Sequence, residues 1–102
     1  MRAVVIVQAR MGSTRLPGKV MMKLGTHTVL DHVLTRCRAI AAAEEVCLAT
    51  SFEPRDDIIA EEAKRLGVRV LRGDEHDVLS RYHAAAAMTG ADDVLRVTAD
   101  CP

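Results

Sequence analysis

Aromatic residues are scarce in this chain of 102 residues, which has one Tyr, one Phe and no Trp. Readers of single-stranded nucleic acid stack bases on aromatic side chains, so this scarcity argues against such a function. The apolar residues, 49% of the chain, must then be mainly Val, Leu, Ile, Ala and Met. A core of that composition is typical of a parallel α/β sheet.

Neither sign of charge is in excess, because Lys plus Arg and Asp plus Glu number 14 each. A neutral chain has no general attraction to DNA, RNA or anionic lipid, so any anion site must be local. A run of about eighteen apolar residues, as a membrane span needs, is missing. Met1-Arg2 leads into only five strongly apolar positions, which is too short for a signal peptide. We therefore expect a cytoplasmic protein that binds neither nucleic acid nor membrane.

The three cysteines, Cys37, Cys47 and Cys101, are odd in number and widely scattered. They show no CxxC spacing and no histidine at metal-ligand distance, so neither a disulfide framework nor a zinc site is predicted. We expect reduced and mostly buried thiols.

Apolar runs and helical periodicities alternate along the chain, which is long enough for one small domain, residues 1–102. The pattern predicts strands over 3–7, 46–49, 68–71 and 94–97, and helices from Val29, from Asp56-Asp57 and from Val78. Connections of this length predict a parallel sheet with right-handed crossovers, whose ligands bind outside the carboxyl ends of the strands. Arg69 interrupts the third strand, which is therefore expected at an edge.

Helix ends are also readable. Thr28 stands where an N-cap is expected, Gly67 and Gly90 follow two of the helices, and the acids before the third helix are expected to cap it and to complement its dipole. These acids are Asp74, Glu75 and Asp77. The chain stops at Asp100-Cys101-Pro102, directly after a strand, so we expect a fragment of a longer protein.

The segment with the most chemistry follows the first strand: Gln8-Ala-Arg10-Met-Gly12-Ser13-Thr-Arg15-Leu-Pro-Gly-Lys19. Glycines allow backbone N–H groups to approach phosphate oxygens, and three permanent cations surround them. The spacing of the glycines, Val20 after Lys19 and the absence of a predicted helix at Lys19 exclude a Walker P-loop, and GxGxxG is absent. The 8–19 loop is thus predicted to bind a polyphosphate, the alternative being a solvated basic turn.

This segment resembles the opening motif of the sugar cytidylyltransferases, the family of 3-deoxy-D-manno-octulosonate cytidylyltransferase and spore coat polysaccharide biosynthesis protein F. The similarity continues in order through Leu48–Ser51, Arg72–Tyr82 and Arg96–Pro102, and so covers nearly the whole chain. It implies a three-layer α/β/α, Rossmann-like domain of the nucleotide-diphospho-sugar transferase type, here only its N-terminal part, without the acceptor-sugar region. The implied reaction moves CMP from CTP to a sugar hydroxyl in surface or spore-coat polysaccharide synthesis, with Mg²⁺, in a full-length homodimer.

The resemblance also implies roles for individual residues. The triphosphate is expected to be held by Arg10, Ser13, Arg15 and Lys19, with Gln8, Ala9 and Gly12 completing the nucleotide loop. Thr50 and Ser51 are expected near the base, and Arg72, Ser80 and Arg81 near the nucleotide. Asp100 is expected to bind Mg²⁺, although from its residue type alone a turn is the alternative.

Two other functions remain open at this stage. One is a non-catalytic nucleotide-binding module. The other is a relative of the sugar-1-phosphate and molybdopterin nucleotidyltransferases, whose openings favour Gly-Gly where this chain has Gln8-Ala9-Arg10.

Overall fold

The computed structural model describes residues 2–12, 18–40 and 42–99. Its centre is a four-stranded sheet of β1 (Ala3–Gln8), β4 (Glu45–Ser51), β5 (Arg69–Gly73) and β6 (Asp93–Thr98). The strand order is β5-β4-β1-β6, and every pair is parallel. All four predicted strands and the parallel sheet are confirmed, and β5 lies at an edge as expected from Arg69.

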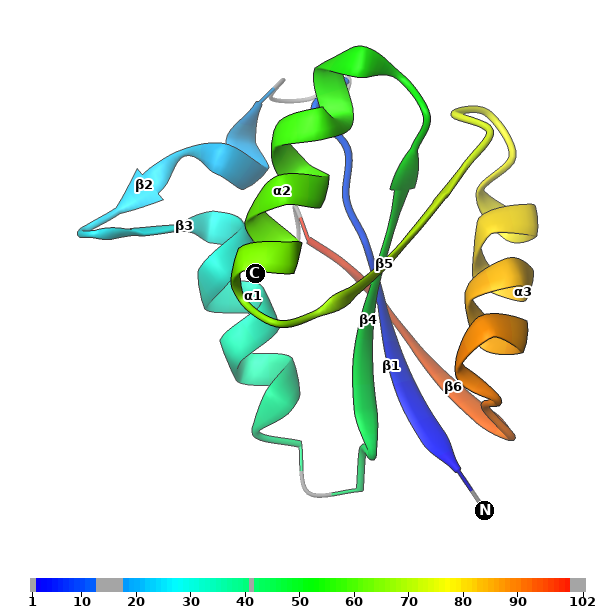
Figure 1. The fold of residues 1–102 in the computed structure, drawn as a ribbon. Coiled ribbons are helices and arrows are strands. Elements are labelled where there is room, and N and C mark those ends of the chain that lie inside the picture. Colours follow the sequence, from blue (N-terminus) through cyan, green and yellow to red (C-terminus); the bar gives the residue numbers. More distant parts are fainter. Residues whose placement is uncertain (1, 13–17, 41, 100–102) are drawn as a thin grey trace.

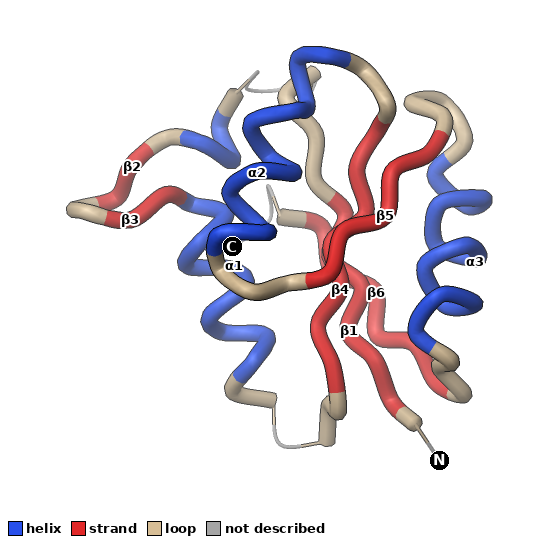
Figure 2. The backbone as a smooth tube through the Cα atoms, in the orientation of Figure 1, coloured by secondary structure: helices blue, strands red, loops and turns tan. Residues whose placement is uncertain are grey.

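Three helices cover the two faces of the sheet, α1 (Val29–Arg38), α2 (Asp57–Arg65) and α3 (Val78–Thr89). Figure 1 shows α1 and α2 on one face and α3 on the other, and Figure 2 shows the strands as the layer between them. The three-layer α/β/α arrangement is therefore present. No helix among the described residues is long and apolar enough to cross a membrane.

The alternation of β1 divides the core between the two faces, because successive side chains of a strand point to opposite sides. Val5 and Val7 pack with α1 and α2, whereas Val4 and Ile6 pack toward α3. Both faces of β1 are therefore covered, which explains its uninterrupted β-branched run. Cys37 and Cys47 are buried free thiols, as predicted, and Cys101 lies outside the described residues.

Predicted caps form at the ends of α1 and α3. The Thr28 hydroxyl accepts a hydrogen bond from Asp31 N (3.0 Å), and the Asp77 side chain accepts one from Ser80 N (2.9 Å). Gly90 ends α3 with φ 69°, a left-handed conformation that glycine adopts without a Cβ penalty.

Four short elements were not predicted. An antiparallel ribbon of β2 (Lys23–Leu24) and β3 (His27–Thr28) precedes α1, and the 3₁₀ turns η1 (Lys19–Met21) and η2 (Pro54–Asp56) follow β1 and β4. The expectation that no helix begins at Lys19 is wrong in the strict sense, since η1 begins there. A three-residue 3₁₀ turn is not the α-helix of a Walker motif, however, and the glycine spacing still excludes that motif.

Candidate functional site

The carboxyl ends of the strands lie side by side because of the sheet register. Gln8 pairs with Ala49 of β4 and with Thr98 of β6, and Ser51 pairs with Gly73 of β5. The carboxyl ends of all four strands consequently lie at one edge, toward the top of Figure 1 for β1, β4 and β5. This is the edge where the sequence placed a ligand.

The 8–19 loop is closed at its base. Gly18 N donates to Met11 O (2.9 Å), so the two ends of the segment meet although residues 13–17 lie outside the described part of the chain. Arg10 precedes this closure and Lys19 follows it. Two of the predicted phosphate-binding cations are thus anchored at the two ends of one closed loop, while Ser13 and Arg15 lie outside the described residues.

Asp56 holds this loop to the strand edge, which the sequence did not reveal. Its side chain is fully buried, its Oδ1 accepts from Met11 N (2.7 Å), and its Oδ2 accepts from the Ser51 hydroxyl. The prediction that Asp56 and Asp57 open α2 is confirmed in position, since Asp56 is the N-cap residue and Asp57 the first helical residue, but the Asp56 side chain makes no cap bond. In the sequence, an acid just before a helix gives the same pattern whether its side chain caps that helix or accepts a hydrogen bond from a distant loop.

The residues predicted near the base are built into the β4 edge. The Ser51 hydroxyl accepts from Glu53 N (3.1 Å), and Thr50 is fully buried, with an Oγ1 that has no hydrogen-bond partner within the described part of the chain. Arg72 donates through Nε to Ser51 O (2.7 Å) and through Nη2 to Glu53 O (3.0 Å). Its guanidinium also pairs with Asp57 (2.8 Å) and so ties β5 to the segment after β4.

Arg81 lies behind the same edge, and its guanidinium is hydrogen-bonded to other residues of the protein. It is 1% exposed, donates through Nε to Gln8 Oε1 (3.3 Å), and donates through Nη1 to the carbonyls of Asp74 and Glu75. Burial, assisted by the positive charge of Arg10, lowers the pKa of Arg81 below its ordinary value. Its Nη2 is buried and has no hydrogen-bond partner among the described residues.

The stem of Arg81 crosses Gly73, where an added Cβ would lie 2.8 Å from Arg81 Cγ. Gly73 is therefore required for close packing. Ser80, by contrast, is exposed in the first turn of α3. The structure thus joins Arg81 to Gln8 and Arg72 to Ser51, and it leaves Ser80 at the surface.

Glu75 departs from the predicted capping role. Its carboxylate lies against Arg55 of η2, and the same oxygen is 3.7 Å from Nη1 of Arg10. Arg55 carried no sequence signal, since an arginine after Pro54 is indistinguishable from an ordinary surface residue. Three connections, those after β1, β4 and β5, thus converge in one cluster of charges.

Metal-ligating groups are sparse among the described residues. No set of three or more His, Cys, Asp or Glu side chains is arranged to hold a metal ion in residues 2–12, 18–40 and 42–99. Asp100, the predicted Mg²⁺ ligand, lies outside these ranges. Its role stays a prediction.

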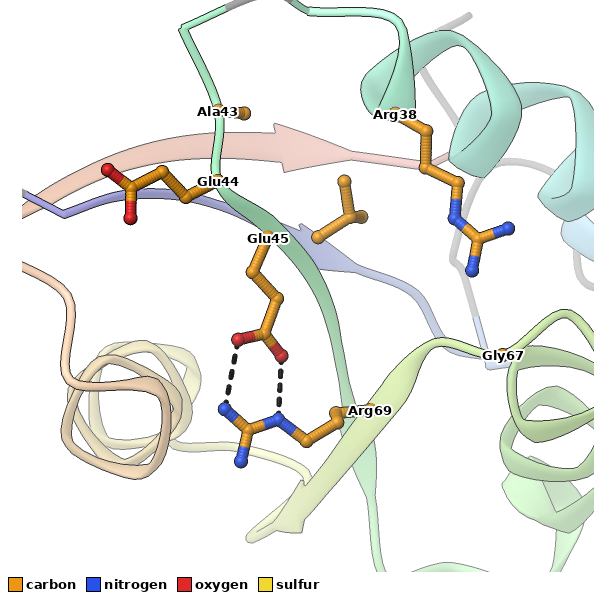
Figure 3. Close-up of a pocket in the computed structure, with 7 residues that line it drawn as sticks. Arg38, Ala43, Glu44, Glu45, Gly67 and Arg69 are labelled. Carbon is orange, nitrogen blue, oxygen red and sulfur yellow. Dashed lines mark hydrogen bonds and ion pairs between the residues drawn. The ribbon is translucent and has the colours of Figure 1, made fainter.

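A pocket lies at the opposite end of the sheet, where the strands begin, and its charged residues have a structural role (Figure 3). This hollow of about 250 Å³ is lined by charged side chains that neutralise each other. Glu45 accepts two hydrogen bonds from Arg69 (2.6 and 2.9 Å) and one from Arg2. The hydrogen bond from Arg69, assisted by both positive charges, lowers the pKa of Glu45. The ion pairs join the beginnings of β1, β4 and β5.

Comparisons with known proteins agree with this geometry. Spore coat polysaccharide biosynthesis protein SpsF of Bacillus subtilis is 40% identical over 101 aligned positions, which cover 95% of this chain and 42% of SpsF. A solved cytidylyltransferase from Leptospira borgpetersenii serovar Hardjo-bovis superposes with a TM-score of 0.94 at 42% identity, over 100% of this chain and 43% of that one. CMP:2-keto-3-deoxy-manno-octonic acid synthetase, solved in complex with CTP, superposes with a TM-score of 0.81 at 25% identity, over 97% of this chain and 40% of that one.

The chain therefore spans about two-fifths of the length of these relatives. A family model described as cytidylyltransferase matches residues 4–102, which include the 8–19 loop and the ends of all four strands. On this match, together with the shared three-layer fold, the chain belongs to the cytidylyltransferase family.

Proposed function

We propose that the protein transfers CMP from CTP to a sugar hydroxyl and releases pyrophosphate. The observation that carries the proposal is the closed 8–19 loop, with Arg10 and Lys19 at its two ends, at the carboxyl edge of the sheet. Family membership supports it, as does the CTP complex of one structural neighbour. A solvated basic turn would not need a buried carboxylate to hold it against the strand edge, as Asp56 does here.

The proposed chemistry is in-line attack of the sugar oxygen on the α-phosphorus. A bond forms between these two atoms, the bond from the α-phosphorus to the bridging oxygen of pyrophosphate breaks, and the hydroxyl proton is released to water. Negative charge accumulates on the leaving pyrophosphate, so fixed cations accelerate the step by electrostatic stabilisation without a covalent intermediate. Arg10 and Lys19 are suited to this task, and the resemblance adds Ser13 and Arg15.

The nucleoside is proposed to lie against the Gln8, Ser51 and Arg72 edge. Arg81 holds the Gln8 carboxamide from behind, and Arg72 is held by two main-chain carbonyls. Each of these groups is positioned by buried or main-chain partners, as selective recognition of one base requires. The choice of CTP over UTP is part of the proposal.

The described residues form no cluster of three or more metal-ligating side chains, so a Mg²⁺ ion would fit here only if the nucleotide supplied most of its ligands. Mg²⁺ is usually held by one or two carboxylates and by phosphate oxygens. The Asp56 carboxylate is already used by Met11 and Ser51. The residue proposed to hold the ion is Asp100, as the family resemblance implies. When bound, Mg²⁺ would neutralise phosphate charge.

The test is release of pyrophosphate by the intact protein from CTP and Mg²⁺, with a keto-acid or an amino sugar as acceptor. UTP, ATP and GTP serve as comparisons. Release that depends on CTP and on an acceptor is expected, and K19A is expected to weaken CTP binding more than cytidine binding. Turnover without CTP dependence would refute the proposal, and CTP binding without turnover would favour a non-catalytic nucleotide-binding module.

A further inference from the structure

Arg10 and Arg55 converge on a single carboxylate oxygen of Glu75, although the three residues come from different connections. Arg10 follows β1, Arg55 lies in η2 after β4, and Glu75 lies between β5 and α3. The Glu75 side chain is only 13% exposed, whereas that of Arg55 is 51% exposed. Two arginines that enclose one largely buried carboxylate form an anion site whose occupant belongs to the protein itself.

Arg55 also lies directly against the 8–19 loop. A Cβ added to Gly12 would come within 2.8 Å of Arg55 Nη2 and 3.0 Å of its Cζ. The absence of a side chain at Gly12 thus makes room for the Arg55 guanidinium. The adjacent Asp56 anchors this segment through Met11 N, so the backbone that carries Arg55 is fixed relative to the loop.

The loop that carries Glu75 is held independently of its carboxylate. The carbonyls of Asp74 and Glu75 both accept hydrogen bonds from buried Arg81. The Glu75 side chain can therefore leave the two arginines without displacing its own backbone. A replacement anion of higher charge would gain from the guanidinium groups of Arg10 and Arg55 that face this point.

We propose that Arg55 is an additional phosphate-binding residue and that Glu75 occupies the phosphate position until the nucleotide displaces it. The ligand class is the polyphosphate of a nucleoside triphosphate, and this inference rests on the proposed function of the 8–19 loop. Arg55 binds the incoming phosphate beside Arg10, while the Glu75 carboxylate turns to solvent. Glu75 is then a competitor of the substrate, and its removal strengthens binding.

Calorimetric titration of the intact protein with CTP, and separately with inorganic tripolyphosphate, tests the proposal without requiring turnover. R55Q is expected to raise the dissociation constants of both ligands about tenfold. This is the lower end of the range for loss of a charge-assisted hydrogen bond, because Arg55 is half-exposed. R55K should restore part of the affinity, and E75Q should tighten binding of both ligands by several fold. R65Q and E62Q are matched controls, because they remove the Arg65–Glu62 pair of α2, in which an exposed arginine likewise meets a largely buried carboxylate (11% exposed). These controls should leave both dissociation constants within about twofold of the wild-type values.

The opposing outcomes are distinct. R55Q binding that matches R65Q, or E75Q binding that is unchanged or weaker, overturns the proposal, provided that urea midpoints show each variant folded. Failure of the wild type and of E75Q to bind either ligand overturns it as well. If the variants behave as expected but no pyrophosphate is released with any acceptor, the transfer reaction fails while the phosphate role of Arg55 stands.

Discussion

Replacing Asp56 by alanine should remove the hydrogen bonds that hold the 8–19 loop to the sheet edge. The substitution removes both acceptor oxygens, one bonded to Met11 N at 2.7 Å and one to the Ser51 hydroxyl. A buried polar group left without its partner costs about 1–3 kcal/mol, so two such groups cost about 2–6 kcal/mol. Met11 is only half-buried and its N–H can bind water, so we expect a loss of about 3 kcal/mol. That is a large share of the free energy of unfolding of a typical domain, which is roughly 5–15 kcal/mol.

Urea unfolding of the intact protein measures this loss, with the slope m checked for constancy. D56N keeps an oxygen for Met11 and offers an amide N–H to Ser51, so we expect a smaller loss of about 1–2 kcal/mol. E61A, an exposed position of the same α2 helix, is the control and should change stability by less than about 0.5 kcal/mol. D56A should also weaken CTP binding, because Arg10 and Lys19 lose their common anchor. If D56A is no less stable than E61A, Asp56 does not fasten the loop and the reasoning is refuted.

Three further outcomes are expected. Arg81→Lys should lower the free energy of unfolding by about 2–3 kcal/mol and weaken CTP binding, because an ammonium cannot reproduce the fork between Gln8 and two carbonyls. Urea unfolding measures the first effect and a CTP titration the second. Glu45, whose pKa is lowered chiefly by the hydrogen bond from Arg69, contributes stability that is present above its unfolded-state pKa and lost as pH falls through the lowered value. Urea midpoints between about pH 6 and pH 3 should therefore fall less steeply in E45Q than in the wild type, and equal slopes would contradict this. Thr50→Val removes a fully buried hydroxyl that lacks a partner among the described residues, so the free energy of unfolding, measured with urea, should be unchanged or higher, and a lower value would contradict this.

The strands and the helix caps could be predicted from the sequence because they depend on residues that are neighbours along the chain. The β-branched run before Gln8 predicts a strand covered on both faces, and β1 is buried on both. Thr28 and Asp77 cap the helices that follow them, since a cap contacts an N–H only three residues away. The common edge at which the strands end also followed from sequence, because strands that alternate with helices must end on one side of a parallel sheet.

The charge cluster at that edge was decided by tertiary structure. Asp56 and Glu75 were both predicted as helix-end acids. The Asp56 carboxylate accepts a hydrogen bond from Met11, and the Glu75 carboxylate pairs with Arg55 and lies 3.7 Å from Arg10, so each has a partner from a distant part of the chain. Residue type and spacing cannot separate these two outcomes, because a carboxylate before a helix satisfies the same local rule in either case.

The amino-acid sequence by itself determined the alternating α/β order, the parallel sheet and a loop of cations at the end of its first strand, because periodicity and chain direction dictate them. Only the tertiary structure decided which side chains meet at that edge. Burial brings Arg81 to Gln8, and the juxtaposition of three connections brings Arg55 and Arg10 to Glu75. Such contacts depend on the distances between strand ends, which no local pattern records.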